Sequence, residues 1–461
     1  MMDFESSPIW TEIRDLISSP VKRKLFDYKL TIHTAKEDYA VWDLHFIEIH
    51  RDYVSKVSEF GNLAFKLGLG DYTHRLYPYR NNLEVTLKKL PVGEQGDLDS
   101  TGIEVTRYKA IFNPQRNPPV GGSELEGINQ EDLNNKEIVE VHLEIIDRSA
   151  EPLRIKTTTG SYMNVTPEKA IRAIMGGESA KIRVDGKVCI DAIDLVPPDN
   201  KESIPNLIIP PMQITAFPTF LQQKICGVYN RAIGTFYQKY KGKKTWYIYP
   251  LYDTERFDGK DPKAVFYFVP QDRLPQIDRS FISEGDILKI AVTAQRIYTD
   301  SAELKLMNEG SGYRMPDARS YMKKPVKMTE DGPVGARANL NHEVSIKSRD
   351  DGLNYVPWKD GPSRNPFHQR SEILKNYMGQ FDLVWENSDH NLIYPGMPCK
   401  CTYLSQGKVK SLKGTVLFSS TLITKAEKYN ASPFRSITRI SLACEPKSDT
   451  PEQSTTGVAG D

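Results

Sequence analysis

The only two cysteines that lie close together in the sequence are Cys399 and Cys401. On a β-strand, alternate residues face the same side, so both thiols would point in one direction and could bind a metal ion. A structural zinc site needs four ligands, and the one nearby histidine is His390. Because no second ligand cluster accompanies the pair, we interpret Cys399 and Cys401 as structural cysteines and predict no metal site.

Two other groups of residues are of types that occur in binding sites. His45 and His50 lie on or near a predicted strand without a partner motif, which is typical of solvated or hydrogen-bonded histidines. Residues 308–312 (NEGSG) resemble a fragment of a phosphate-binding glycine loop, but the terminal lysine is missing and no strand leads into a helix there. We therefore predict no catalytic residues, no cofactor-binding residues and no cofactor.

Lysines alternate with aromatic residues between positions 237 and 246, as Lys239, Lys241, Lys243 and Lys244 among Tyr237, Tyr240 and Trp246. This pattern is typical of a platform on which single-stranded nucleic acid stacks. The alternative is a hairpin tip with solvated lysines beside buried aromatic side chains. The balance of 61 basic and 60 acidic residues, a net charge of +1, favours the hairpin, because nucleic-acid binders usually carry a basic domain or stripe.

Other functional classes have little support in the sequence. There is no nucleophile-elbow motif, paired-histidine zinc helix or kinase signature, although the many carboxylates leave open a carbohydrate-cleaving β enzyme with a spatially assembled acid pair. Five scattered cysteines favour reduced thiols in a cytosolic environment. No apolar run approaches the roughly 20 residues of a membrane span, and the N-terminus lacks the apolar region of a secretory signal. The chain is predicted to be a binding or building element, not an enzyme.

The predicted helices and strands of the chain are arranged around residues 214–250. Apolar residues at helical spacing predict a helix that begins at Pro218 and ends at Gly234, with Phe217, Leu221, Ile225, Val228 and Ala232 on one face. The period then changes from 3.6 to 2, which predicts an aromatic hairpin of residues 236–240 and 245–249 around a turn at 241–244. This piece would lie between two β regions.

Alternating apolar residues predict at least six strands before residue 150, typical of a sandwich or small barrel. The alternation changes parity at Ile47 and Ile49, which indicates a bulge or a strand covered on both faces. After residue 260 a second β region is predicted, with strands near 265–269, 287–292, 381–385, 401–403, 416–418 and 437–442.

The remaining segments are predicted from caps, glycines and prolines. Residues 8–19 form a short helix or arm, and Thr166 caps a helix that Gly176 and Gly177 close. A tight Asp185-Gly186 hairpin follows, and 196–211 is a proline-rich connector. Residues 371–378 form a short helix, 113–136 and 308–340 are long loops, and 447–461 is a disordered tail.

This order of parts resembles the baseplate hub proteins of contractile-tailed bacteriophages. Three stretches carry the resemblance over roughly two thirds of the chain, at 217–254, at 306–315 (LMNEGSGYRM), and in the C-terminal block 394–425 with 435–446. In such hubs a helix and an aromatic hairpin lie between two tube-like barrels, and a Pro-Gly-Met pattern closes the second one. The matching positions here are Pro395, Gly396, Met397, Pro398, Leu412 and Gly414.

The resemblance implies a mainly β (α+β) fold, with two tube-like barrel or sandwich domains and a helix-plus-hairpin middle domain. It implies a homotrimer whose six similar domains face a hexameric tail tube protein, while three equivalent surfaces face a trimeric central spike protein. Other baseplate proteins and the tape measure protein would be further partners. DNA would pass through the lumen without specific nucleic-acid binding, and the virion baseplate would be assembled in the host cytoplasm.

The predicted segments are an N-terminal arm (1–22), a first β-barrel (23–160), the middle domain (161–260), a second β-barrel with long loops (261–446) and the tail (447–461). The alternatives are a hub or spike of another contractile or long-tailed injection machine, the carbohydrate-active enzyme, and the nucleic-acid binder. An enzyme requires a cleft with convergent acids, and a nucleic-acid binder requires affinity that falls with salt. A hub requires threefold self-association.

Overall fold

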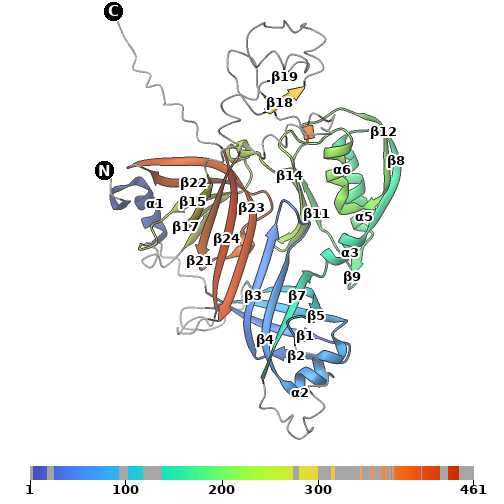
Figure 1. Cartoon of the computed structure of the whole chain (residues 1–461), viewed down its shortest axis with the longest axis vertical. Coiled ribbons are helices and arrows are strands. Elements are labelled where there is room, and N and C mark those ends of the chain that lie inside the picture. The colour runs from blue at the N-terminus through green and yellow to red at the C-terminus, as the bar shows by residue number, and fades with distance from the viewer. Residues whose placement is uncertain are drawn as a thin grey trace, which may run out of the picture.

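The structure is a computed structural model, and it is mainly β, as the sequence predicted (Figure 1). It describes residues 4–17, 25–92, 102–117, 138–273, 280–298, 313–316, 343–344, 355–356, 365, 367–368, 371, 375, 378–405, 407–425 and 434–445. The predicted loops 113–136 and 308–340, the predicted helix 371–378 and the tail 447–461 lie wholly or largely outside these residues.

The first β domain is a strongly curved antiparallel sheet with the strand order β2-β1-β5-β6-β7-β4-β3. Its strands are β1 (Leu25–His33), β2 (Asp38–Val41), β3 (Asp43–Asp52), β4 (Phe60–Gly68), β5 (Leu83–Val92), β6 (Glu104–Phe112) and β7 (Ile138–Asp147). The register of β3 against β4 shifts between Leu44 and Phe46, which confirms a bulge and leaves His45 as the extra residue. The bulge turns both Leu44 and Ile47 into the core.

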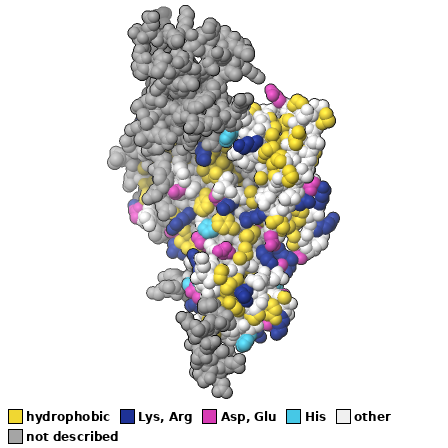
Figure 2. All heavy atoms as spheres, turned by 45° about the vertical axis from the view of Figure 1, so that its right-hand side comes forward, with side chains coloured by type: hydrophobic (Ala, Val, Ile, Leu, Met, Phe, Trp, Pro, Cys, Tyr) yellow, Lys and Arg dark blue, Asp and Glu magenta, His cyan; other side chains and the backbone are white. Residues whose placement is uncertain are grey.

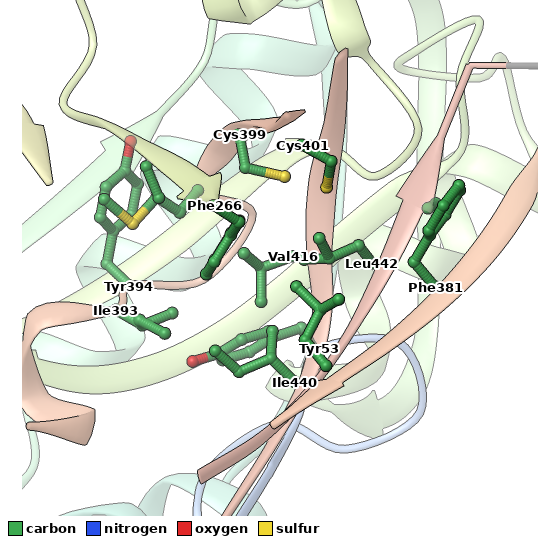
Figure 3. Close-up of a cluster of buried hydrophobic side chains, with 14 of the residues drawn as sticks. Tyr53, Phe266, Phe381, Ile393, Tyr394, Cys399, Cys401, Val416, Ile440 and Leu442 are labelled. Carbon is green, nitrogen blue, oxygen red and sulfur yellow. The ribbon is translucent and has the colours of Figure 1, made fainter. Parts of the chain in front are cut away.

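The second β domain is a closed barrel. Its ring runs β23-β22-β15-β17-β21-β24 and returns to β23, with β16 paired outside it to β17. The strands are β15 (Lys263–Phe268), β16 (Phe281–Glu284), β17 (Ile287–Tyr298), β21 (Gly379–Glu386), β22 (Pro398–Ser405), β23 (Lys408–Lys425) and β24 (Phe434–Cys444). Phe266, Phe381, Val416, Ile440 and Leu442 fill its interior (Figure 3).

The two β domains are one continuous sheet, because the long strand β23 belongs to both. Residues Phe418 to Thr424 of β23 pair with β24 on one side and with β3 on the other. The far end of the β23–β24 hairpin completes the first core, where Ile423 is buried and the Phe434 ring meets Tyr28 edge-on at 5.6 Å. The shared hairpin therefore fixes one β domain relative to the other.

The middle region is built of small sheets and short helices around its own core. Its elements are α3 (Ala150–Ile155), β8 (Thr157–Val165), α4 (Pro167–Ile171), η4 (Arg172–Gly176), α5 (Gly177–Ala180), β9 (Arg183–Val184), β10 (Lys187–Val188), β11 (Ala192–Leu195), β12 (Ile204–Gln213), η5 (Ile214–Ala216), α6 (Phe217–Lys224), β13 (Ile233–Tyr240) and β14 (Lys243–Pro250). As predicted, Thr166 accepts a hydrogen bond from the Lys169 amide, and Asp185-Gly186 forms the β9–β10 turn.

The β13–β14 hairpin is confirmed, and it separates two cores. Alternate residues point to opposite faces. Tyr237, Trp246 and Ile248 pack into the middle-region core, whereas Phe236, Tyr247 and Tyr249 pack into the core of the second barrel. The sequence pattern of consecutive aromatic residues is therefore that of a strand buried on both faces.

Three expectations about the middle region are wrong. Helix α6 ends at Lys224, because the buried Gln222 side chain bonds the backbone of Val228 and Tyr229 and Gly227 adopts a φ of +78°. Gly234 lies inside β13 instead of capping the helix. Residues 204–211 of the predicted connector belong to β12, and Gly176 and Gly177 continue a helical path into α5 with negative φ angles.

The N-terminal helix α1 (Pro8–Ile17) is confirmed and covers the outside of the second barrel, where Ile9 and Ile13 pack on Tyr267, Val269 and Ala291 (Figure 1). The short remaining elements are η1 (Phe4–Ser6), α2 (Leu69–Asp71), η2 (Tyr72–Leu76), η3 (Tyr77–Tyr79), η6 (Thr254–Asp258), β18 (Tyr313–Pro316), β19 (Glu343–Val344), β20 (Tyr355–Val356) and η9 (His390–Leu392).

Candidate functional site at the junction of the β domains and the hairpin

A cavity of about 250 Å³ lies where the first β domain, the tip of the β13–β14 hairpin and η9 come together. Strand β1 contributes Tyr28, β3 contributes Arg51, β5 contributes Lys89, and η9 contributes His390. The hairpin contributes Lys239 and Lys241 on the exposed side. We call this space the junction cavity.

Arg51 is the centre of the hydrogen-bond network in the cavity wall. Its side chain is 4% exposed, and its Nε and Nη2 lie 3.0 and 2.9 Å from Oε2 of Glu59. Nη1 donates to the carbonyl oxygen of His390 at 2.7 Å and Nη2 to Oδ1 of Asn391 at 2.8 Å. A buried guanidinium needs this degree of pairing, because desolvation of an unpaired charge costs several kcal/mol. Arg51 thereby ties β3 to η9.

Lys89 makes a second tie between the same two parts of the chain. Its Nζ lies 2.6 Å from Oδ1 of Asp389 and 3.6 Å from Oε2 of Glu104, and it sits 4.0 Å from the centre of the Phe26 ring. Both Lys89 and Asp389 are buried. Two buried charge clusters thus hold the first β domain to the segment that precedes β22.

Two buried polar atoms in the lining have no hydrogen-bond partner, namely the Tyr28 hydroxyl and Nδ1 of His390. Each residue is 5% exposed. Burial, with the nearby Asp389 and Glu104 carboxylates, raises the pKa of Tyr28 well above its ordinary value, so its hydroxyl stays protonated. Burial, with the Arg51 and Lys89 charges, lowers the pKa of His390 well below its ordinary value, so its imidazole stays neutral.

The cysteine pair lies inside the second barrel (Figure 3). Cys399 and Cys401 are both fully buried on β22, and Sγ of Cys401 lies 4.0 Å from Sγ of Cys444. His390 is directed into the junction cavity instead. Among the described residues, no group of three or more His, Cys, Asp or Glu side chains is arranged to hold a metal ion. The pair acts as core packing here.

The lysine and aromatic residues of the hairpin do not form a stacking platform. The Tyr237 and Trp246 rings are each 1% exposed and pack edge to face at 5.4 Å. Lys244 donates to Ser149 and Lys239 donates to the carbonyl of Val105, which anchors the tip to both neighbouring regions. Tyr240, the third aromatic residue of the pattern, is partly exposed, and its ring packs against that of Tyr394 at 5.4 Å. Base stacking needs several accessible rings, so the single-strand binding hypothesis loses its structural basis.

The other residues singled out in the sequence lie apart from one another. His45, at the bulge, bonds Glu140 at 2.8 Å, while the His50 ring stacks on Phe60 at 5.1 Å. Residues 308–312 are outside the described residues. In the described part of the chain, no helix is both long enough and apolar enough to cross a membrane.

The sequence did not point to Arg51, Glu59, Lys89 or Asp389 as a set. Lys89 and Asp389 are 300 positions apart, and Arg51 and Asn391 are 340 apart, so no local spacing could connect them. The only available signal was a charge within an apolar strand pattern, as in the segments holding Arg51 and Lys89. Because buried charged residues are nearly always paired, this pattern would have indicated that each of the two residues has a charged partner, but not which residue that partner is.

Part of the molecular surface is apolar on the outer side of the β8–β12 ribbon. Met163 on β8 is 77% exposed, and Ile208 on β12 and Ile155 at the end of α3 are each 71% exposed. The pairing of Ile208 with Ser161 and of Asn206 with Met163 places Ile208 and Met163 on one face of the ribbon, opposite the buried Leu207 and Ile209. Figure 2 turns this side forward and shows hydrophobic side chains gathered over its upper part.

No protein-family model matches the sequence, and no curated protein matches it. Among solved structures, the chain is similar to a tail protein from Neisseria meningitidis MC58, with 9% identity over 90% of this chain and 96% of that one and a TM-score of 0.44. It is also similar to the 43 kDa tail protein of prophage MuSo2 from Shewanella oneidensis, with 10% identity over 92% and 100% and a TM-score of 0.44. A third is the E. coli c3393 protein, a component of the type VI secretion system, with 7% identity over 91% and 77% and a TM-score of 0.41. Similarities of this size do not by themselves assign a function.

Proposed function

We propose that this chain is a structural component of a phage-tail baseplate, a trimeric hub ring that joins a hexameric tail tube to a trimeric spike. The observation that carries the proposal is the β23–β24 hairpin shared by both β domains. It joins the two β domains through one continuous sheet, as a ring segment under mechanical load requires. A hub of another contractile or long-tailed injection machine is the nearest alternative.

The arrangement of strands supports this reading. The closed barrel has six ring strands, and the first β domain has six principal strands in the order β1-β5-β6-β7-β4-β3, among the residues described. Three copies of such a chain present six similar domains, which matches a partner with sixfold symmetry. They also present three equivalent copies of every other surface, which matches a partner with threefold symmetry. Closed rings of identical subunits are the usual form of soluble assemblies.

The apolar outer face of β8–β12 supports self-association. Large exposed aliphatic side chains grouped on one face mark contact surfaces. Trp42, between β2 and β3, is 96% exposed and is a second such position, since tryptophan is enriched in the centres of interfaces. The proposed role is mechanical and not enzymatic.

The test is the solution mass of the purified chain by light scattering, followed by negative-stain imaging of the same fraction. We expect three times the 52.4 kDa subunit mass and a ring with an open centre. Ile208→Glu should shift the mass toward one subunit, while Val54→Glu, at a valine that is 44% exposed outside the β8–β12 face, should not. A monomer at all concentrations would contradict the proposal.

A further inference from the structure

The junction cavity has an excess of positive charge on its exposed side. Arg51, Lys89, Lys239 and Lys241 line it together with two carboxylates, Glu59 and Glu104, and a third carboxylate, that of Asp389, lies against Lys89. Arg51 and Lys89 are paired within the wall. Lys239 donates to a backbone carbonyl and Lys241 lies 5.4 Å from the centre of the Tyr240 ring, so neither ammonium group has a carboxylate partner among the described residues.

The residues that line the cavity include two hydrogen-bond donors without acceptors. The protonated Tyr28 hydroxyl is one, and Nδ1 of the neutral His390 imidazole can carry a proton and act as the other. Buried polar atoms in folded proteins nearly always have a partner, because an unmade hydrogen bond is costly. A group that accepts hydrogen bonds from these donors is therefore expected in the cavity.

We propose that the junction cavity binds a small oxyanion of the phosphate class. Lys239 and Lys241 supply the compensating charge, and Tyr28 and His390 donate hydrogen bonds to its oxygens. At about 250 Å³ the cavity has room for such an anion together with water, since one water occupies about 30 Å³ in the liquid. This goes beyond the proposed structural role, because a bound anion would bridge β1, the hairpin and η9 and so stabilise the junction.

The first experiment titrates the full chain with inorganic phosphate at constant ionic strength set by sodium chloride. Isothermal titration calorimetry should show saturable binding of one phosphate per chain. At saturation the melting temperature should rise by about 2–4 °C, whereas chloride alone should have no effect. Absence of saturable binding would mean that the cavity holds water only and would overturn the inference.

Tyr28→Phe tests the site without removing any other bond. The ring and its contact with Phe434 remain, and loss of an unpartnered hydroxyl leaves the ligand-free melting temperature unchanged or higher. Phosphate affinity should fall about tenfold. Tyr39→Phe is the matched control, because the Tyr39 hydroxyl is also unpartnered but lies outside the cavity lining. Equal affinity in both variants would overturn the assignment.

Lys241→Asn tests the charge at the exposed side. Residue 241 has a φ of +47°, which asparagine tolerates well, so the turn should be preserved. We expect at least tenfold weaker phosphate binding, while Lys243→Asn, outside the lining of the same hairpin, should leave the affinity unchanged. A chain that forms trimers but binds no phosphate contradicts only this inference. A monomeric chain that binds phosphate contradicts only the proposed hub.

Discussion

The ring of Tyr249 on β14 lies directly against Gly396, so closely that a β-carbon on residue 396 would come 2.1 Å from Cδ2 of the ring. Gly396 also has a φ of +64°, a backbone conformation that favours glycine. The contact joins the aromatic hairpin to the Pro-Gly-Met segment that precedes β22. Two sequence patterns almost 150 residues apart are thus parts of one packed layer in the second barrel.

Gly396→Ala should therefore destabilise the chain strongly. The added methyl group must displace a buried ring in addition to straining the backbone, and we expect a loss of about 3 kcal/mol or more in the free energy of unfolding. Gly285→Ala is the matched control, with a φ of +61° and no atom within 4 Å of the built β-carbon, and should lose about 1–2 kcal/mol. Urea unfolding followed by tryptophan fluorescence measures both. Equal losses would contradict the packing argument.

The buried pair of Lys89 and Asp389 gives a second prediction. Lys89→Met leaves the Asp389 carboxylate buried without its cation, and we expect a loss of about 3–5 kcal/mol in unfolding free energy. The double variant Lys89→Met with Asp389→Asn should recover part of this loss, because neither charge then remains unpaired.

An exposed ion pair provides the comparison for that experiment. Lys425 and Asp43 form an ion pair of 2.8 Å with side chains 56% and 41% exposed. Lys425→Met should cost less than about 1 kcal/mol, because surface pairs are screened by water. If Lys89→Met and Lys425→Met unfold at the same urea concentration, the buried cluster does not hold the junction.

The raised pKa of Asp147 predicts how the free energy of unfolding depends on pH. Burial, with a smaller effect of Glu59, raises the pKa of Asp147 from 3.8 to about 6, so the folded state holds its proton more tightly than the unfolded chain does. Its stabilising contribution is complete below pH 3.8 and is lost as the pH rises to about 6. Asp147 accepts hydrogen bonds from the amides of Ser149 and Ala150, which an asparagine oxygen can also accept.

Asp147→Asn should therefore remove this pH dependence and keep the hydrogen bonds from the Ser149 and Ala150 amides. At pH 7 the variant should be more stable than the wild type by about 1–3 kcal/mol, with the difference shrinking toward pH 4. Urea unfolding midpoints at pH 4, 5, 6 and 7 test this expectation. Parallel pH profiles for the two proteins would show that another group is responsible.

The cysteines predict slow thiol chemistry in the native protein. Cys189, Cys399, Cys401 and Cys444 are buried, and Cys226 is the least buried of the five. Burial raises the pKa of the Cys226 thiol to about 11, so little reactive thiolate is present at pH 8. We expect a thiol reagent to titrate all five in urea and fewer than one per chain within minutes under native conditions. Rapid reaction of several thiols would contradict the packed barrel.

Local sequence alone was sufficient for elements whose signal lies in neighbouring residues. The strand alternation, the parity change at Ile47 and Ile49, the Thr166 cap, the Asp185-Gly186 turn and the aromatic hairpin all follow from side-chain period or from turn and cap chemistry. Predictions from neighbouring residues were wrong where a contact with a residue elsewhere in the chain decides the local structure. The helix was expected to reach Gly234, but the Gln222 side chain ends it early and the Tyr249 ring needs that glycine in a strand.

The sequence by itself therefore determined the mainly β class, the position of the aromatic hairpin and the near-neutral charge that argues against nucleic-acid binding. Only the tertiary structure decided that β23 joins the two β domains and that Tyr28 and His390 share a cavity. It also decided that Arg51 bonds His390, 339 positions away, and that Lys89 pairs with Asp389, 300 positions away. The physical reason is that these contacts depend on strand order and on burial of paired charges. Neither leaves a regular spacing along the chain.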